Sequence, residues 1–192
     1  AMALPDDSAG RYQAVSDAFG GLVSGTVDWD SPAPVAGWRA RDVVWHLTDW
    51  IPGVLHDGAG IDLPRRDPAS TDPATDWTAF DRGMREVVAR PDLASASFAH
   101  PMAGTMPLGS AIDMLVTPDV FMHSWDLARA SGQSITLDAD YSAGLLAGME
   151  GIEEVLRSSG HYGPRVAVAD DADITTRLMA FIGRDPHWRT GR

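Results

Sequence analysis

Residues 119–130 read DVFMHSWDLARA and lie within a helical apolar pattern that spans residues 108–130. Asp119 and His123 are four residues apart, which places both side chains on one face of a helix, one turn apart. The same face is otherwise apolar, and a carboxylate there is costly unless it meets a counter-charge, hydrogen-bond donors or a metal. Two interpretations stay open: Asp119 satisfies backbone amides near a helix start, or it shares a metal with His123.

Helical periodicity recurs along the rest of the chain. Apolar residues spaced three and four apart predict further helices at about 7–23, 38–52, 75–88, 138–156 and 173–182. We expect Thr75 or Asp76 to cap the third, and Pro52-Gly53 to end or kink the second. Pro118 either kinks the helix at 108–130 or starts a fresh one after Thr117.

The segments between these helices carry turn residues. Residues 57–73 predict a long surface loop, 98–108 a short hairpin, and 166–168 a short strand. The pattern as a whole predicts a mostly α fold, an up-down bundle of four helices with additional short helices, in a single domain over residues 1–192. Ala1 before Met2 is interpreted as an expression scar before the start methionine.

Composition excludes several function classes. The formal net charge is −12, so nucleic acid and anionic membrane surfaces would be repelled as partners. The chain contains neither lysine nor cysteine, which excludes Schiff-base lysine chemistry, a cysteine nucleophile and thiolate metal ligands. No apolar run of 18 residues and no secretory signal is visible, and a cytoplasmic location is expected by default.

His46 adds a third potential ligand. Its neighbours Val43, Leu47 and Trp50 direct it toward the core, where a histidine bonded to backbone is the simpler interpretation. One His from an early helix, together with Asp119 and His123 from a later one, is nevertheless how a helical bundle builds a three-ligand metal site. Since imidazoles bind metal when neutral, we expect metal affinity to fall below about pH 6.

Other residues are assigned supporting roles around this site. Asp126 either accepts a proton from the second ring nitrogen of His123 or pairs with Arg129 on the surface. Trp45 and Trp125, each near a proposed ligand, are expected to wall the metal pocket, and His100 is a candidate acid or base at the bundle mouth. The remaining histidines are expected to be solvated: His56, His161 and His187.

Three stretches of the chain, residues 28–47, 119–132 and 183–186, resemble the DinB-like superfamily, specifically the actinobacterial branch related to mycothiol-dependent maleylpyruvate isomerase. In that family a helical bundle binds a divalent metal, often zinc or nickel, through a His of the first block and two ligands spaced by four. The resemblance therefore implies His46, Asp119 and His123 as ligands of one metal ion. The isomerase has Glu where Asp119 stands and a further carboxy-terminal domain, so the resemblance implies fold and metal site rather than that substrate.

The leading functional hypothesis is a metal-dependent thiol transferase or isomerase that acts on a small-molecule substrate. The metal would lower the pKa of a thiol, or of water in a hydrolytic version. Because the chain has no cysteine, the sulfur would come from a low-molecular-weight thiol such as mycothiol. Two alternatives stay open: a non-catalytic metal-binding or ligand-sensing bundle, and a non-haem iron oxygenase with two His and one carboxylate. A homodimer is also left open.

Overall fold

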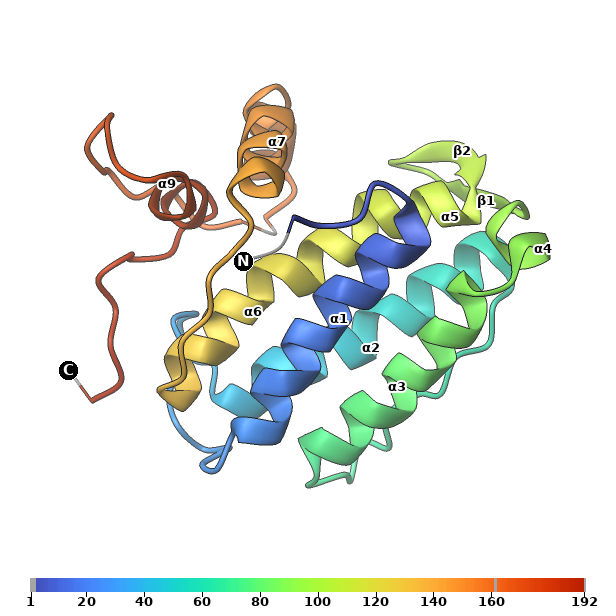
Figure 1. Cartoon of the computed structure of the whole chain (residues 1–192), viewed down its shortest axis with the longest axis horizontal. Coiled ribbons are helices and arrows are strands. Elements are labelled where there is room, and N and C mark those ends of the chain that lie inside the picture. The colour runs from blue at the N-terminus through green and yellow to red at the C-terminus, as the bar shows by residue number, and fades with distance from the viewer. Residues whose placement is uncertain (1–2, 161, 192) are drawn as a thin grey trace.

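A computed structural model of the chain, which describes residues 3–160 and 162–191, is mostly helical (Figure 1). Its long helices are α1 (Ser8–Gly25), α2 (Ala40–Ala59), α3 (Pro73–Val88) and α6 (Thr117–Ser131). Both α1 and α2 pack against α3 and α6, so the four helices surround one apolar core. All four contribute fully buried side chains to it, among them Phe19, Leu47, Phe80 and Leu127. The predicted mostly α fold is confirmed. Ala1, Met2 and His161 lie outside the described residues.

Shorter elements connect and flank these helices. After α3 come α4 (Pro91–Ala94), β1 (Ser97–His100), β2 (Gly104–Pro107), α5 (Leu108–Ala111) and the π-helical turn η1 (Ile112–Val116). The two strands pair antiparallel, which confirms the predicted hairpin. The chain ends with α7 (Ala139–Glu150), α8 (Glu153–Ser158) and α9 (Ile174–Phe181). The helices α7 and α9 pack on each other and lie beside α6, apart from the other long helices (Figure 1).

Aspartates fix the starts of four helices. Asp7, Asp72, Asp138 and Asp173 each accept a hydrogen bond from the backbone amide three residues later, at distances of 2.7, 3.1, 2.7 and 2.9 Å. The expectation that Thr75 or Asp76 caps α3 is therefore wrong. Pro73 has no amide hydrogen and suits the first helical position, so the helix starts earlier, directly after Asp72.

The two prolines expected to end, kink or start helices both lie in helical backbone. Pro52 neither ends nor interrupts α2, which continues to Ala59 with Pro52 buried inside it. Pro118 lies in the first turn of α6, directly after η1, and the backbone stays helical from Ala111 through Thr117. Thr117 does not cap the helix, because its buried hydroxyl has no hydrogen-bond partner in the described structure.

Two further expectations near the carboxyl end are wrong. Residues 138–156 do not form one helix: α7 ends at Glu150, and Ile152 between α7 and α8 is exposed rather than on an apolar face. Residues 166–168 are not a strand; Val166 donates one backbone hydrogen bond to Ala180 of α9. A lone bond to the end of a helix offers no ladder for a strand to join.

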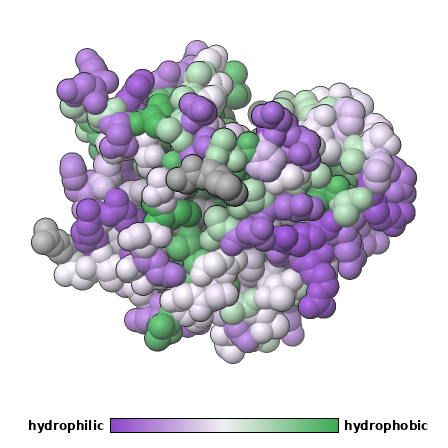
Figure 2. Space-filling view, in the orientation of Figure 1, coloured by the Kyte–Doolittle hydropathy of each residue, from purple (hydrophilic) through white to green (hydrophobic). Residues whose placement is uncertain are grey.

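Hydrophilic residues dominate the face seen in Figure 2, and the apolar residues on it form small, separate patches. No helix in the described part of the chain combines the length and hydropathy that a bilayer crossing requires.

Candidate metal centre

The packing of α2 against α6 brings His46, Asp119 and His123 together. Each offers one potential ligand atom, and these three atoms lie within 4.8 Å of one another. His46 Nε2 is 3.0 Å from Asp119 Oδ2, and His123 Nε2 is 3.4 Å from Asp119 Oδ1. The spacing of four on α6 and the inward position of His46 on α2 thus converge on one point.

The group lies at the edge of the core. The side chain of His123 is 8% exposed and that of Asp119 is 19% exposed, whereas His46 is 32% exposed. One side of the group is therefore anchored in the protein, while the His46 side is accessible from solvent.

Asp126 orients His123 from behind. Its Oδ2 atom lies 2.8 Å from His123 Nδ1, and its side chain is fully buried. Of the two alternatives for Asp126, the structure shows this one: Arg129 instead lies over the ring of Trp125. Because Asp126 accepts a hydrogen bond from Nδ1 of His123, the opposite ring nitrogen, Nε2, faces Asp119. Metal-binding imidazoles are commonly oriented by such a hydrogen bond.

Two tryptophans complete the surroundings. The indole N–H of Trp50 donates to Asp119 Oδ2 over 2.9 Å. The ring of Trp38 lies 5.2 Å from the imidazole of His46 and 5.8 Å from that of His123, centroid to centroid. The aromatic wall of the site is thus Trp38 and Trp50.

A tight turn before α2 places Trp38. Ala33 N–H donates to Trp38 carbonyl oxygen over 2.9 Å, and Trp38 N–H donates to Val35 carbonyl oxygen over the same distance. Gly37 has a φ of +79°, which favours glycine at this turn. This Pro-rich segment therefore folds back and holds an aromatic ring beside both imidazoles.

The charges of the group stabilise one another. Burial lowers the pKa of His123, but the carboxylates of Asp119 and Asp126 raise it more strongly, to about 9. Burial likewise raises the pKa of Asp119, but the charge of His123 and hydrogen bonds from His123 and His46 bring it well below its usual value. Two carboxylates thus favour the protonated form of His123, and a cation that binds Nε2 displaces that proton.

Two proteins of Mycobacterium tuberculosis are similar to this chain: the uncharacterized proteins MT0763, from strain CDC 1551 / Oshkosh, and Rv0738, from strain ATCC 25618 / H37Rv. Each is 30% identical over 182 residues, which is 90% of this chain and 95% of the relative. The chain belongs to the family of these mycobacterial proteins. No family model matches it, and no solved structure shows a significant match.

Three residues that the sequence analysis placed around the metal ligands lie away from them in the structure. Trp45 turns toward α3, where its indole N–H donates to Asp76 over 2.9 Å. Trp125 is buried on the opposite side of α6, because two residues after His123 the helix has turned by about 200°. His100 ends β1, and its neighbour Phe98 packs against Gly58, twelve residues and about 18 Å along α2 from His46.

Sequence reasoning missed four contributors to the site. Trp38, Trp50 and Arg184 contact its members directly. Tyr162 is the fourth: burial raises its pKa, the nearby charge of Asp119 raises it further, and the charge of Arg184 lowers it. Trp50 was visible one turn after His46, and Arg184 lies in a stretch that carries the family resemblance. Trp50 was interpreted only as a packing neighbour of His46, and Arg184 only as part of the family resemblance. Neither was considered as a contact of the site residues.

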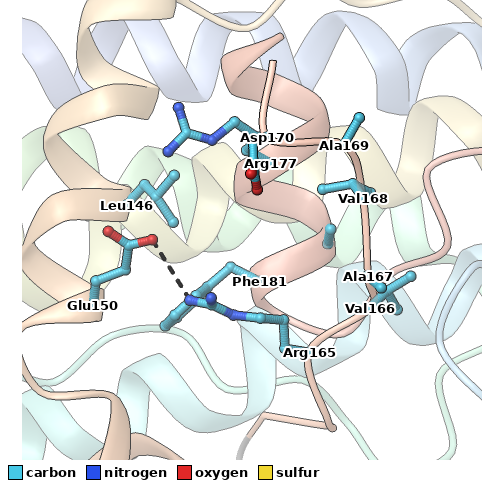
Figure 3. Close-up of a pocket in the computed structure, with 11 residues that line it drawn as sticks. Leu146, Glu150, Arg165, Val166, Ala167, Val168, Ala169, Asp170, Arg177 and Phe181 are labelled. Atoms are coloured by element: carbon cyan, nitrogen blue, oxygen red, sulfur yellow. Dashed lines mark ion pairs between the residues drawn. The ribbon is translucent and has the colours of Figure 1, made fainter. Parts of the chain in front are cut away.

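A separate cavity of about 420 Å³ lies between α7, α9 and residues 165–170 (Figure 3). An ion pair of 3.5 Å joins Arg165 and Glu150 in its lining, beside the apolar side chains of Leu146 and Phe181. None of the metal-ligand candidates lines this cavity. The histidines His56 and His187 are exposed, as expected.

Proposed function

We propose that His46, Asp119 and His123 hold one divalent metal ion in a DinB-like helical bundle, and that the protein is a metal-dependent enzyme of the thiol transferase or isomerase type. The observation that carries the proposal is the convergence of the three ligand atoms within 4.8 Å. The DinB-like assignment rests on the motifs of residues 28–47, 119–132 and 183–186.

The donor set fits zinc or nickel. Two imidazoles and one carboxylate are borderline nitrogen and oxygen ligands, which both metals accept. Ligand atoms about 2.1 Å from a tetrahedral metal lie about 3.4 Å apart. Each imidazole approaches a different oxygen of Asp119 at a separation close to this value, His46 Nε2 to Oδ2 at 3.0 Å and His123 Nε2 to Oδ1 at 3.4 Å. When bound, the cation supplies Lewis acidity that lowers the pKa of a thiol or water.

The number of ligands favours a reactive centre over a structural one. Within residues 3–160 and 162–191, the group has three members, His46, Asp119 and His123. Structural zinc sites use four protein ligands, whereas catalytic sites use three and leave a position for water or substrate. The exposed side of His46 supplies the approach for a small molecule.

The surrounding side chains favour an anionic ligand with an apolar body. Asp119 and Asp126 each contribute one negative charge and Arg184 one positive charge, so a divalent cation leaves the cluster with a net charge of +1. A thiolate is attracted to such a centre. The ring of Trp38 beside both imidazoles excludes water on one side and offers an apolar surface to the carbon skeleton.

The thiol must be a separate molecule, since the chain contains no cysteine. The family resemblance supports mycothiol, and the kinship with mycobacterial proteins is in keeping with an actinobacterial thiol. The proposed reaction is addition of this thiolate to one carbon of an electrophilic double bond: a carbon–sulfur bond forms as the π bond opens, and the neighbouring carbon takes up a proton to give a thioether. In the isomerase version, rotation about the new single bond and loss of the thiolate restore the double bond in the other geometry.

Mass spectrometry tests the activity. Zinc- or nickel-loaded protein is incubated with mycothiol and a small electrophile such as a maleyl compound, and thioether or isomerised product is measured against time. We expect the loaded protein to form product faster than metal-free protein, and loaded His56→Ala, which changes an exposed histidine outside the site, to form product at the wild-type rate. A stoichiometric metal with no turnover for any thiol would support the non-catalytic alternative, and iron in the protein as purified, before any loading, would support the oxygenase.

A further inference from the structure

Arg184 contacts the centre from the far end of the chain. It follows α9, and its guanidinium makes two hydrogen bonds to Asp126: Nε to Oδ1 over 2.9 Å and Nη2 to Oδ2 over 2.8 Å. The Arg184 side chain is 13% exposed and that of Asp126 is fully buried. A two-point contact of this kind fixes the plane of the carboxylate as well as its position.

The turn after α9 holds Arg184 in place. Its backbone N–H donates to Met179 carbonyl oxygen over 2.9 Å, and its Nη1 donates to Ile182 carbonyl oxygen over 3.2 Å. Gly183 has a φ of +95°, and a side chain there would press on the backbone of Gly163 and Pro164. The turn after α9 therefore has a defined conformation, and this conformation places the Arg184 side chain against Asp126.

Asp126 needs this partner to serve His123. Its Oδ2 atom accepts from both Arg184 and His123 Nδ1. Without Arg184, the imidazole would be the single remaining side-chain partner of Asp126 among the described residues, and a buried carboxylate held at one point rotates out of its plane or shifts away. Either change removes the acceptor that directs Nε2 of His123 toward Asp119.

We infer that Arg184 is a positioning residue for the metal centre: through Asp126 it fixes the orientation of His123, so that metal affinity depends on the docked α9 turn. This inference rests on the proposed metal site. It also makes the coupling reciprocal, since metal binding must stabilise the docking of α9 by the same free energy.

The chain offers a matched control in Arg157. It also anchors the carboxyl-terminal helices, with hydrogen bonds of 2.7 Å to Gly163 carbonyl oxygen and 2.6 Å to Phe181 carbonyl oxygen. None of the contacts described for it reaches Asp126. Loss of Arg157 therefore weakens the packing of this region without removing the guanidinium that holds the carboxylate.

The test measures zinc affinity by competition with a chromogenic chelator at one fixed pH. The proteins are wild type, Arg184→Ala, Arg184→Lys and Arg157→Ala. We expect Arg184→Ala to bind zinc about 10- to 100-fold more weakly, the usual effect of losing an outer-shell partner. Arg184→Lys, which keeps the charge but not the two-point contact, falls in between, and Arg157→Ala, which keeps the guanidinium on Asp126, loses less affinity than either Arg184 variant. Millimolar guanidinium restores affinity to Arg184→Ala alone.

Several results would overturn the inference: wild-type affinity in Arg184→Ala, an equal loss in Arg157→Ala, or no rescue by guanidinium. If circular dichroism shows that Arg184→Ala does not fold, Arg184→Lys decides, and wild-type affinity in that variant contradicts a two-point positioning role. Failure of the wild-type protein to bind zinc would instead refute the proposed metal site, so the two failures are distinguishable.

Discussion

Zinc affinity should rise steeply with pH between 7 and 9, because His123 carries a proton that the metal must displace. The neighbouring carboxylates raise the pKa of this imidazole to about 9. At pH 7 about one molecule in 100 then has a neutral His123, which reduces apparent affinity about 100-fold, or by about 2.7 kcal/mol. Affinity should therefore gain nearly tenfold per pH unit and level off above pH 9.

A chelator competition at each pH measures this slope. Calorimetry in two buffers of different ionisation enthalpy counts the protons, and about one should be released on binding at pH 7. An ordinary imidazole would confine the effect to below about pH 6.5. Affinity that stays constant from pH 7 to 9, or binding without proton release, would refute the described charge arrangement around His123.

Three further outcomes follow from the same geometry. Trp50→Phe removes a hydrogen bond to Asp119 and should weaken zinc binding several-fold, whereas Trp45→Phe, on the same helix, should leave the chelator titration unchanged. Phe98→Ala should lower the free energy of unfolding by about 3–5 kcal/mol in urea titrations and leave metal content at the wild-type value, because the ring is fully buried far from the site. The free energy of unfolding of metal-free protein should fall by up to about 3 kcal/mol as pH rises from 6.5 to 9. The raised pKa of His123 stabilises the fold only while the imidazole is protonated, so His123→Asn should lack this loss.

The ligand candidates could be found from sequence because their relation is local. Asp119 and His123 are one turn apart, and a helix fixes that geometry whatever else the chain does. His46 required one further step, the packing of its apolar face against another helix. The same reasoning failed for Trp45, because consecutive residues on a helix point about 100° apart, so Trp45 does not share the face of His46. Trp50, one turn after His46, lies on that face instead.

The outer partners could not be predicted in this way. Arg184 reaches Asp126 across 58 residues, through a turn whose position depends on how α9 packs. Pro52 looked like a helix end because its ring removes one backbone hydrogen bond, yet it is buried within α2, where tertiary packing outweighs that cost. Helix capping was the local feature that could best be predicted from sequence. Even so, the predicted start of α3 was wrong, because Pro73 occupies the first helical position and Asp72 is the cap.

Elemental analysis of the purified protein tests the central claim most directly. Wild-type protein, loaded with zinc and freed of excess by gel filtration, should contain one zinc per chain. His46→Ala and His123→Ala should each lose most of it while keeping a helical circular dichroism spectrum, because the bundle core is built from other side chains. The exposed His56→Ala serves as the control and should keep one zinc. Full zinc content in both His46→Ala and His123→Ala would place the metal elsewhere and contradict the account.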